Sequence, residues 1–500
     1  MKRILSSLLA VALLASLAPA ARADDAASLL AKHRAYVGWQ FGDGTVTSYK
    51  ATGQSTSDSA GKPEVYRTLT LLQLGAIFRK TQHSPKIGRD TANGFTGNIF
   101  WESDMNGFTH PIAGDALNLQ ASQAILFNEG TTALPGTLHG SATIDGIACT
   151  IVRVTPEHGD AIDLYIDPST GAYKRAVIDP DGTYETPIDI LAYSDVLPGK
   201  KIISKFKGQH SKYTTEYTSF QGNVPVAIPD LHPPSPIASW TFANPQPFHV
   251  TITDDRVYFD ATVNGAKGRF ILDTGNGVGM SFTKSFADRA GIKSLEGGRA
   301  FGIGGGVDIQ YGTVKSFVVG GNTLSGAIAD FDDSRLDADG IIGYTMLAGV
   351  ISRLSYSNST LTIEDPSTDV TSVQGIHTII DLSGGQPAIP MKLDGKIDVL
   401  ATLDSGNPLY VAFGKDIIFK YGVRMIRGEL LAAGVGGYEV EECGHIDELS
   451  VGPIRFQTPS SCVSPAFTGR DVLVGFSFMK NFDFVFDYPH VGMVMTPIQH

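Results

Sequence analysis

Residues 268–282 read GRFILDTGNGVGMSF, and this stretch decides the fold. An apolar run leads into the Asp-Thr-Gly tripeptide at 273–275, and another apolar stretch follows soon after it. Residues 400–412, LATLDSGNPLYVA, repeat the arrangement with Asp-Ser-Gly at 404–406. Asp, Thr, Ser and Gly are ordinary turn residues, so one such tripeptide indicates only a tight turn at the end of a strand.

The two tripeptides lie in matching surroundings, which indicates an internal duplication from about residue 248 onward. Each follows a predicted hairpin whose turn residues tolerate positive φ, and each precedes a short predicted helix that ends at Gly. This repeated order is far more specific than either tripeptide. The matching pairs are the turns 264–265 and 394–395, the helix-ending Gly291 and Gly422, the glycine-rich turns 304–306 and 434–437, and the apolar-apolar-Gly elements 341–343 and 473–475.

Two similar units can pack about a pseudo-twofold axis, which would bring Asp273 and Asp404 face to face. Two carboxylates that lie close together cannot both ionise easily, so they share a proton. One then acts as a base and the other as an acid, and such a pair can activate a water without a metal. We therefore expect Asp273 and Asp404 to be catalytic. The expected supporting turn residues are Thr274, Gly275, Asn276, Ser405, Gly406 and Asn407.

Residues 248–500 resemble the aspartic peptidase superfamily, as two retropepsin-like lobes, 248–370 and 371–500, in one chain. The resemblance rests on the two tripeptides, the apolar-apolar-Gly elements and the glycine-rich turns. It implies a β fold with the active site between the lobes, a peptide or protein substrate, and hydrolysis without a cofactor or a metal. Asn276 and Asn407 stand where the family usually has Ala, Ser or Thr, which leaves a protein that binds peptides without cleaving them as the alternative.

The resemblance also implies mobile hairpins that cover the active site. The pepsin-type flap tyrosine has no unambiguous counterpart, and each of the two candidate tyrosines can equally be a strand aromatic that packs on its neighbour. The flap candidates are Gly304, Gly305, Tyr311, Gly436 and Tyr438.

The N-terminal half begins with a predicted secretory signal, residues 1–23, which has a positive start and a short apolar core. Its removal takes three basic residues, so the mature net charge is 36 − 51 = −15. This charge argues against nucleic acid as a partner, and no later apolar stretch is long enough to predict a membrane span. We expect a periplasmic protein.

Apolar and polar residues alternate along much of 24–223, which predicts an antiparallel sheet after one short helix. The Pro-rich segment 224–247 predicts a linker or a strap on the surface. The whole chain is therefore expected to be mainly β. The strand rhythm of 24–223 resembles the periplasmic lipoprotein-carrier type of sheet. That resemblance implies an apolar cavity, so a carrier of an apolar ligand is a second alternative. The sequence does not choose whether this half carries an acyl or peptide ligand, is an inhibitory or folding-assisting segment, or is a plain adaptor.

The remaining motifs are sparse. Cys443 and Cys462 are the candidate disulfide pair and Cys149 a buried thiol, although three reduced cysteines are an equal alternative. The sequence contains neither an H-E-x-x-H motif nor a Cys/His knuckle, so it predicts no zinc site. The acid-rich segment 330–340, DFDDSRLDADG, is expected to be a solvated loop.

Overall fold

A computed structural model shows that the chain is mainly β, as its sequence predicts. The predicted signal, residues 1–23, lies outside the described part of the chain. No described helix is both long enough and apolar enough to cross a membrane. The structure describes residues 25–499 except positions 60, 61, 183, 184, 210, 212, 244, 278, 303, 304, 334, 335, 428, 429, 435, 436, 465, 466 and 468–470.

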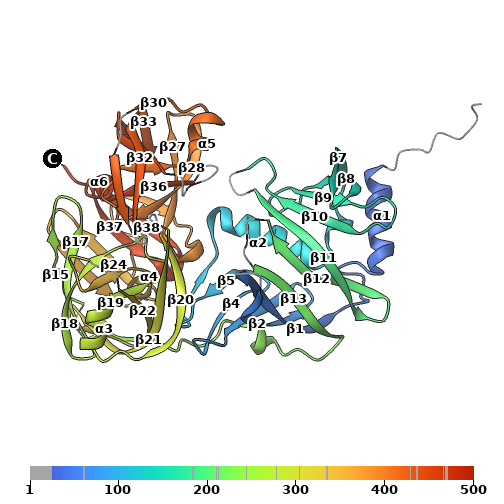
Figure 1. Ribbon diagram of the computed structural model, residues 1–500, viewed down its shortest axis with the longest axis horizontal. Coiled ribbons are helices and arrows are strands. Elements are labelled where there is room, and N and C mark those ends of the chain that lie inside the picture. The colour runs from blue at the N-terminus through green and yellow to red at the C-terminus, as the bar shows by residue number, and fades with distance from the viewer. Residues whose placement is uncertain are drawn as a thin grey trace, which may run out of the picture.

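An antiparallel sheet forms the N-terminal part of the molecule, and it holds thirteen strands within the described residues (Figure 1). Strands β1 and β13 pair in its middle, β2 to β6 follow outward on one side, and β12 back to β7 follow on the other. The predicted run of consecutive hairpins is therefore confirmed. The strands are β1 (Ser48–Ser59), β2 (Lys62–Leu74), β3 (Ile77–Ser84), β4 (Arg89–Phe95), β5 (Phe100–Ser103), β6 (Thr109–Pro111), β7 (Gly136–Ile144), β8 (Ile147–Val154), β9 (Ile162–Ile166), β10 (Tyr173–Ile178), β11 (Thr186–Leu197), β12 (Lys200–Gly208) and β13 (Tyr213–Gly222).

Two α-helices accompany the described part of this sheet. Helix α1 (Ala26–Val37) is the predicted one, and the Asp25 side chain caps it by accepting from the Ser28 N–H at 2.7 Å. Helix α2 (Gly114–Phe127) is not predicted by the sequence, because Ala113 at its start offers no side-chain cap and no basic residue marks its last turn. A short 3₁₀ turn, η1 (Thr131–Ala133), follows α2.

The two lobes repeat one strand arrangement, as the duplication predicts. In the first lobe the central order is β19-β23-β18-β17, and in the second it is β29-β36-β28-β27. In both, the strand that leads to the aspartate has a parallel neighbour, β23 beside β18 and β36 beside β28. These strands are β17 (Val257–Val263), β18 (Ala266–Leu272), β19 (Met280–Thr283), β23 (Gly340–Ile342), β27 (Ala388–Leu393), β28 (Ile397–Asp404), β29 (Val411–Phe413) and β36 (Asp471–Gly475).

The outer strands and short helices also correspond between the lobes. The helices α3 (Lys284–Arg289) and α5 (Lys415–Phe419) are followed by Gly291 and Gly422, both with positive φ. Helices α4 (Tyr344–Leu347) and α6 (Phe476–Met479) follow β23 and β36. The outer strands are β16 (Thr251–Ile252), β20 (Ser294–Gly302), β21 (Gly305–Val319) and β22 (Asn322–Asp332) in the first lobe, and β30 (Met425–Arg427), β31 (Leu430–Gly434), β32 (Gly437–Ile446), β33 (Glu448–Val451), β34 (Ile454–Gln457) and β35 (Ser460–Val463) in the second.

A third sheet joins the lobes, because β24 of the first lobe pairs antiparallel with β37 of the second. One continuous apolar core extends through both lobes and includes Phe270 and Phe478. The lobes therefore share their interior. The strands of this sheet are β15 (Phe248–His249), β24 (Ile351–Ser355), β25 (Thr360–Glu364), β26 (Ile376–Ile379), β37 (Phe482–Asp487) and β38 (Gly492–Pro497).

The N-terminal sheet is attached to the first lobe by specific hydrogen bonds. The turn between β5 and β6 presents Asn106, whose Oδ1 accepts from the Ile328 N–H at 2.8 Å. Its backbone carbonyl accepts from Ile237 and Ala238 in the Pro-rich segment. That segment contains η2 (Ile228–Leu231) and ends in β14 (Ser239–Thr241), which pairs with β22. The connecting segment thus lies against the lobe.

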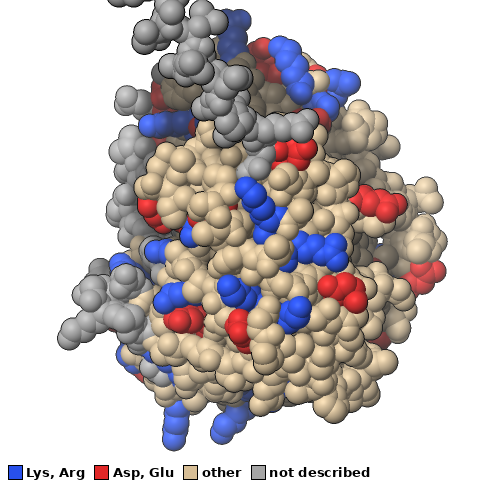
Figure 2. Space-filling view, turned by 90° about the vertical axis from the view of Figure 1, so that its right-hand side faces the viewer, with Lys and Arg blue, Asp and Glu red and all other residues tan. Residues whose placement is uncertain are grey.

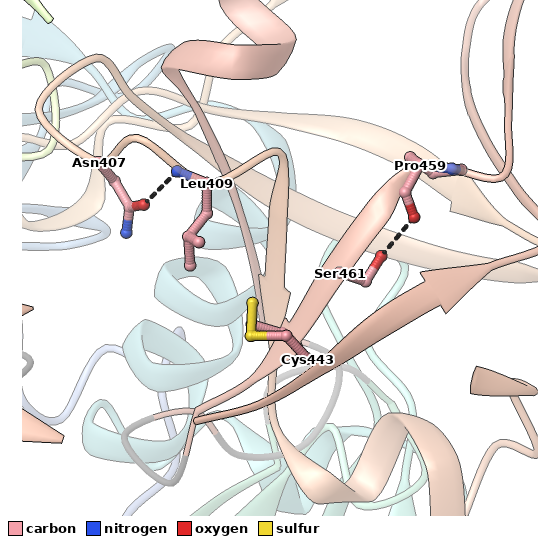
Figure 3. The surroundings of a disulfide bond; sticks show 6 residues. Asn407, Leu409, Cys443, Pro459 and Ser461 are labelled. Atoms are coloured by element: carbon pink, nitrogen blue, oxygen red, sulfur yellow. Dashed lines mark hydrogen bonds between the residues drawn. A yellow bond between two sulfur atoms is a disulfide. The ribbon is translucent and has the colours of Figure 1, made fainter. Parts of the chain in front are cut away.

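The cysteines differ in state. Cys443 and Cys462 are register partners on β32 and β35 and form a disulfide, whereas Cys149 is a buried free thiol. Figure 3 shows Leu409 beside this disulfide, with its N–H donating to Asn407 Oδ1 at 2.9 Å. The bond therefore lies near the turn that follows Asp404.

The surface of the N-terminal sheet mixes charges of both signs. On the face seen in Figure 2, Lys and Arg side chains are interspersed with Asp and Glu. Several charges of this sheet are paired, such as Arg153 with Asp163 and Arg175 with Asp189, each at 2.6 Å. The visible face presents no single-sign field.

Candidate active site

The two aspartates stand at equivalent places in the lobes. Asp273 follows β18 directly, and Asp404 is the last residue of β28. A glycine lies at the end of β36 (Gly475), and another directly follows β23 (Gly343). Each lets a turn pack tightly, because a Cβ on Gly343 would lie 2.2 Å from the Asp273 carbonyl oxygen and one on Gly475 would lie 2.4 Å from that of Asn407. Any larger residue would push the turn away. This explains the apolar-apolar-Gly elements.

The turns face each other across the lobe interface, and each contacts the other's carboxyl group. A Cβ on Gly275 would lie 2.3 Å from Asp404 Cγ, and a Cβ on Gly406 would lie 2.4 Å from Asp273 Cγ. The carboxyl groups lie close enough together for the negative charge of Asp273 to act on Asp404. The predicted face-to-face arrangement of Asp273 and Asp404 is thus what the structure shows.

Thr274 and Ser405 lock the two turns together by a reciprocal exchange of hydrogen bonds. The Thr274 N–H donates to Ser405 Oγ, and the Ser405 N–H donates to Thr274 Oγ1, both at 3.1 Å. Each hydroxyl then donates into the opposite lobe, Thr274 to the Leu403 carbonyl at 2.6 Å and Ser405 to the Leu272 carbonyl at 2.8 Å. Both side chains are fully buried, so these bonds have no competition from water.

The electrostatics of the pair favour one shared proton. Burial raises the pKa of Asp273 and Asp404 above the ordinary range, and the pKa of Asp404 is raised further by the negative charge of Asp273. Backbone N–H groups of the two turns, such as Gly406 to Asp404 Oδ1 at 3.0 Å, act in the opposite direction. The two groups titrate as a unit, so the shared proton belongs to the pair.

Comparison with known proteins agrees with this geometry in the first lobe. Residues 259–346 match the aspartyl protease family model. The match contains Asp273 and Gly343 and ends before Asp404. No curated protein matches the chain.

Two solved structures are similar to part of the chain. One is a DUF1329 family protein from Desulfovibrio piger, at 12% identity and a TM-score of 0.30, covering 41% of this chain and 95% of that one. The other is a domain assigned as an outer membrane lipoprotein-sorting protein from Vibrio parahaemolyticus, at 10% identity and a TM-score of 0.29, with the same two coverages.

The asparagines that depart from the peptidase pattern brace the turns. Asn276 Nδ2 donates to Ser281 Oγ at 3.1 Å and to the Ile341 carbonyl at 3.4 Å. Asn407 Oδ1 accepts from the Leu409 N–H. The contacts of each Asn stay within its own lobe, so each Asn holds the shape of its own turn.

Asp330 corrects one sequence expectation. The acid-rich segment was expected to be solvated from residue 330, but Asp330 lies in β22 and is only 3% exposed. It accepts from Ser281 Oγ at 3.0 Å, and Ser281 accepts from Asn276. Burial raises the pKa of Asp330 to about 7. A chain of polar contacts thus runs from a buried carboxyl group to the turn that follows Asp273.

Two further neighbours of the pair carry no sequence signal. Gln386, which follows η3 (Ser383–Gly385), donates from Nε2 to the Gly275 carbonyl of the opposite lobe. Tyr488 lies in η4 (Tyr488–His490), and burial raises the pKa of its phenol. The negative charge of nearby Asp273 raises this pKa further. Both are long-range neighbours that the sequence pattern could not indicate.

The structure describes only some of the flap candidates. Gly304 and Gly436 lie outside the described residues, and so does the Tyr438 side chain. Gly305 pairs with Gly302 where β20 and β21 meet, and β31 and β32 meet in the same manner in the second lobe. Tyr311 pairs with Asp330 across β21 and β22, and burial and that charge raise its pKa to about 12. Tyr311 therefore stands on the strand, away from the hairpin tip.

Metal-ligating groups gather at one place in the described chain, where Glu441 lies near Cys443 and Cys462. Because the two sulfurs form a disulfide, neither is a thiolate that could bind a metal. The cluster therefore offers a metal ion at most one ligand group, the Glu441 carboxylate.

Thr274→Val should lower the free energy of unfolding by about 2–4 kcal/mol. The change keeps the shape but leaves the buried Leu403 carbonyl and the Ser405 N–H without partners, and each such group costs ~1–3 kcal/mol. Urea unfolding measures the effect. Thr262→Val on β17 is the control, since that side chain makes no such bonds, and equal losses in both variants would contradict the role of Thr274.

Asp330→Asn should flatten the pH dependence of stability. A raised pKa means that the folded state holds a proton that the unfolded state releases, so this contribution is complete below about pH 4 and is lost as the pH rises to about 7. The expected loss in the native protein is on the order of 3 kcal/mol. Urea unfolding at pH 4.5 and 7.5 tests it, with exposed Asp260→Asn as the control. Parallel slopes in the native protein and Asp330→Asn would contradict the prediction.

Proposed function

We propose that the bilobal part of the chain is an aspartic-type endopeptidase that hydrolyses peptide bonds. The observation that carries the proposal is the pair of carboxyl groups, Asp273 and Asp404, each of which two similar lobes bring against the turn of the other. The exchange between Thr274 and Ser405 holds that contact in place. The aspartyl protease match at 259–346 supports the same activity.

The chemistry follows from the shared proton. The ionised carboxylate of the Asp273–Asp404 pair accepts a proton from a water whose oxygen attacks the peptide carbonyl carbon, while its protonated partner donates a proton to the carbonyl oxygen. The tetrahedral intermediate then collapses with cleavage of the C–N bond, and a proton passes to the leaving amine. The two products are a carboxylic acid and an amine, and the pair regains its single proton.

A peptide that contains a statine residue tests this proposal against a binding protein that has kept the fold and lost the chemistry. Its hydroxyl imitates the tetrahedral intermediate, so an active pair should bind it at least 10²-fold more tightly than the matching substrate peptide. Equal affinity for the two peptides would favour the binding protein.

The rate of hydrolysis should follow a bell-shaped pH profile. Activity needs one proton on the pair, so it falls when the pH drops far enough to protonate both groups and when it rises far enough to ionise both. Because burial raises both pKa values, the acidic limb should lie above the pKa of a free Asp, ~3.9. A profile of kcat/KM against pH checks this, and an acidic limb below pH 3 would contradict it.

The proposed place of action is the periplasm. The basis is the predicted signal at 1–23, and the disulfide between Cys443 and Cys462 supports an oxidising compartment. N-terminal sequencing of the exported protein should begin at Asp24, and an uncleaved Met1 would contradict the signal.

A further inference from the structure

A cavity of about 320 Å³ lies in the N-terminal sheet, and its described lining residues all precede the lobes. Helix α2 covers it with Gln120, Gln123, Ala124 and Phe127, which share one helix face. The volume is at the lower end for small-ligand sites. The cavity is thus separate from the aspartate pair.

The wall of the cavity is built from rows of side chains across neighbouring strands. Leu71, Lys80 and Asn93 are successive register partners on β2, β3 and β4, and all three line the cavity. Phe78 stands two residues before Lys80 on the same face of β3. Most of the remaining wall is aliphatic or aromatic, with Phe, Ile and Tyr side chains from β11, β12 and β13.

Lys80 is the one group with a charge at neutral pH among the described lining residues. Its ammonium has no carboxylate or carbonyl partner in the described chain, and burial lowers its pKa below the ordinary value. An unpaired ammonium in an apolar wall costs folding free energy. Its register partner on β4, Asn93, donates weakly from Nδ2 to Gln120 Oε1 at 3.5 Å, and both amides line the same cavity.

We propose that this cavity binds a single acyl chain that ends in a carboxylate, with Lys80 as the counter-ion. The apolar wall fits the hydrocarbon chain, and the ammonium supplies the one charge that a carboxylate needs. A phosphate head group carries up to two negative charges and would find only one cation here. The amides of Asn93 and Gln120 lie where they can donate to the second carboxylate oxygen.

The test compares dodecanoic acid with dodecanol, which has the same chain and no charge. Calorimetric titration of the delipidated full-length mature protein should show that the acid binds about ten- to a hundredfold more tightly, the range expected for a hydrogen bond to a charged group. In Lys80→Met this preference should vanish while dodecanol still binds. Lys50→Met on β1 is the matched control, because Lys50 is exposed on the other face of the sheet, and it should keep the preference.

A stability measurement accompanies the titration. Without ligand, Lys80→Met should unfold at a higher temperature than the native protein, because it removes an unpaired charge from a partly buried position in an apolar wall. Equal affinity of the native protein for acid and alcohol, no binding of either, or a preference that persists in Lys80→Met would each overturn the proposal. Tighter binding of dodecyl phosphate than of dodecanoic acid would overturn the assignment of a carboxylate.

Discussion

Asp273→Asn and Asp404→Asn should each retain the fold and lose peptide hydrolysis by at least 10²- to 10⁴-fold. Asn has nearly the same shape as Asp but can neither accept nor release the shared proton, so the pair loses its base or its acid. The two losses should not add in the double variant, because either change disables the same pair. Each variant should also be more stable than the native protein near neutral pH, since burial of a charge is relieved.

The measurement is cleavage of a mixed peptide library by the mature protein and by both variants, from acid to neutral pH. Asp260→Asn serves as the control, because Asp260 is an exposed carboxylate in the same lobe. Cleavage that survives in both Asp273→Asn and Asp404→Asn would show that another site carries the activity. Folded native protein that cleaves nothing at any pH would favour a binding protein.

Gly406→Ala should reduce kcat by about 10²-fold or more while the chain still folds. The new methyl group would stand 2.4 Å from Asp273 Cγ, so the carboxyl group must move, and a displacement of about 1 Å costs on the order of 10²-fold in rate. The overpacking should lower the free energy of unfolding by ~1–3 kcal/mol. Gly275→Ala should behave alike, because its methyl group would meet Asp404 in the same way.

Gly492→Ala is the matched control for these two variants. Gly492 begins β38 in the shared sheet, and a Cβ there would meet Asp487 at an ordinary 3.6 Å. Its activity should remain near that of the native protein. Full activity in Gly406→Ala would show that the close contact between turn and carboxyl group is not needed for hydrolysis.

The sequence predicts the aspartate pair because its signal is local and occurs twice. A strand, a tight Asp-Thr/Ser-Gly turn and a later apolar-apolar-Gly element are each short-range patterns. The structure contains them in the same order in both lobes. The same reasoning predicts the N-terminal meander, since each hairpin has its own turn residues.

The remaining neighbours of the site depend on long-range contacts. Gln386 reaches Gly275 over 111 residues, and no local pattern marks such a pair. The sequence predicts that Asp330 is solvated, because acidic residues surround it in the chain. In the structure, Asp330 is buried because it pairs with Ser281 across the parallel strands β22 and β19. Helix α2 lacks a capping signal and is held by the sheet it covers.

The shared sheet between the lobes has a consequence for the timing of activity during synthesis. Strands β37 and β38, which complete that sheet beside β24, come from residues 482–497, so they leave the ribosome after β24 and after both aspartate turns. Each turn also relies on the other lobe for the contacts of its carboxyl group. A nascent or half-translocated chain therefore has no assembled pair. On the proposed function, the protein could not attack itself or the export machinery before β37 and β38 are in place.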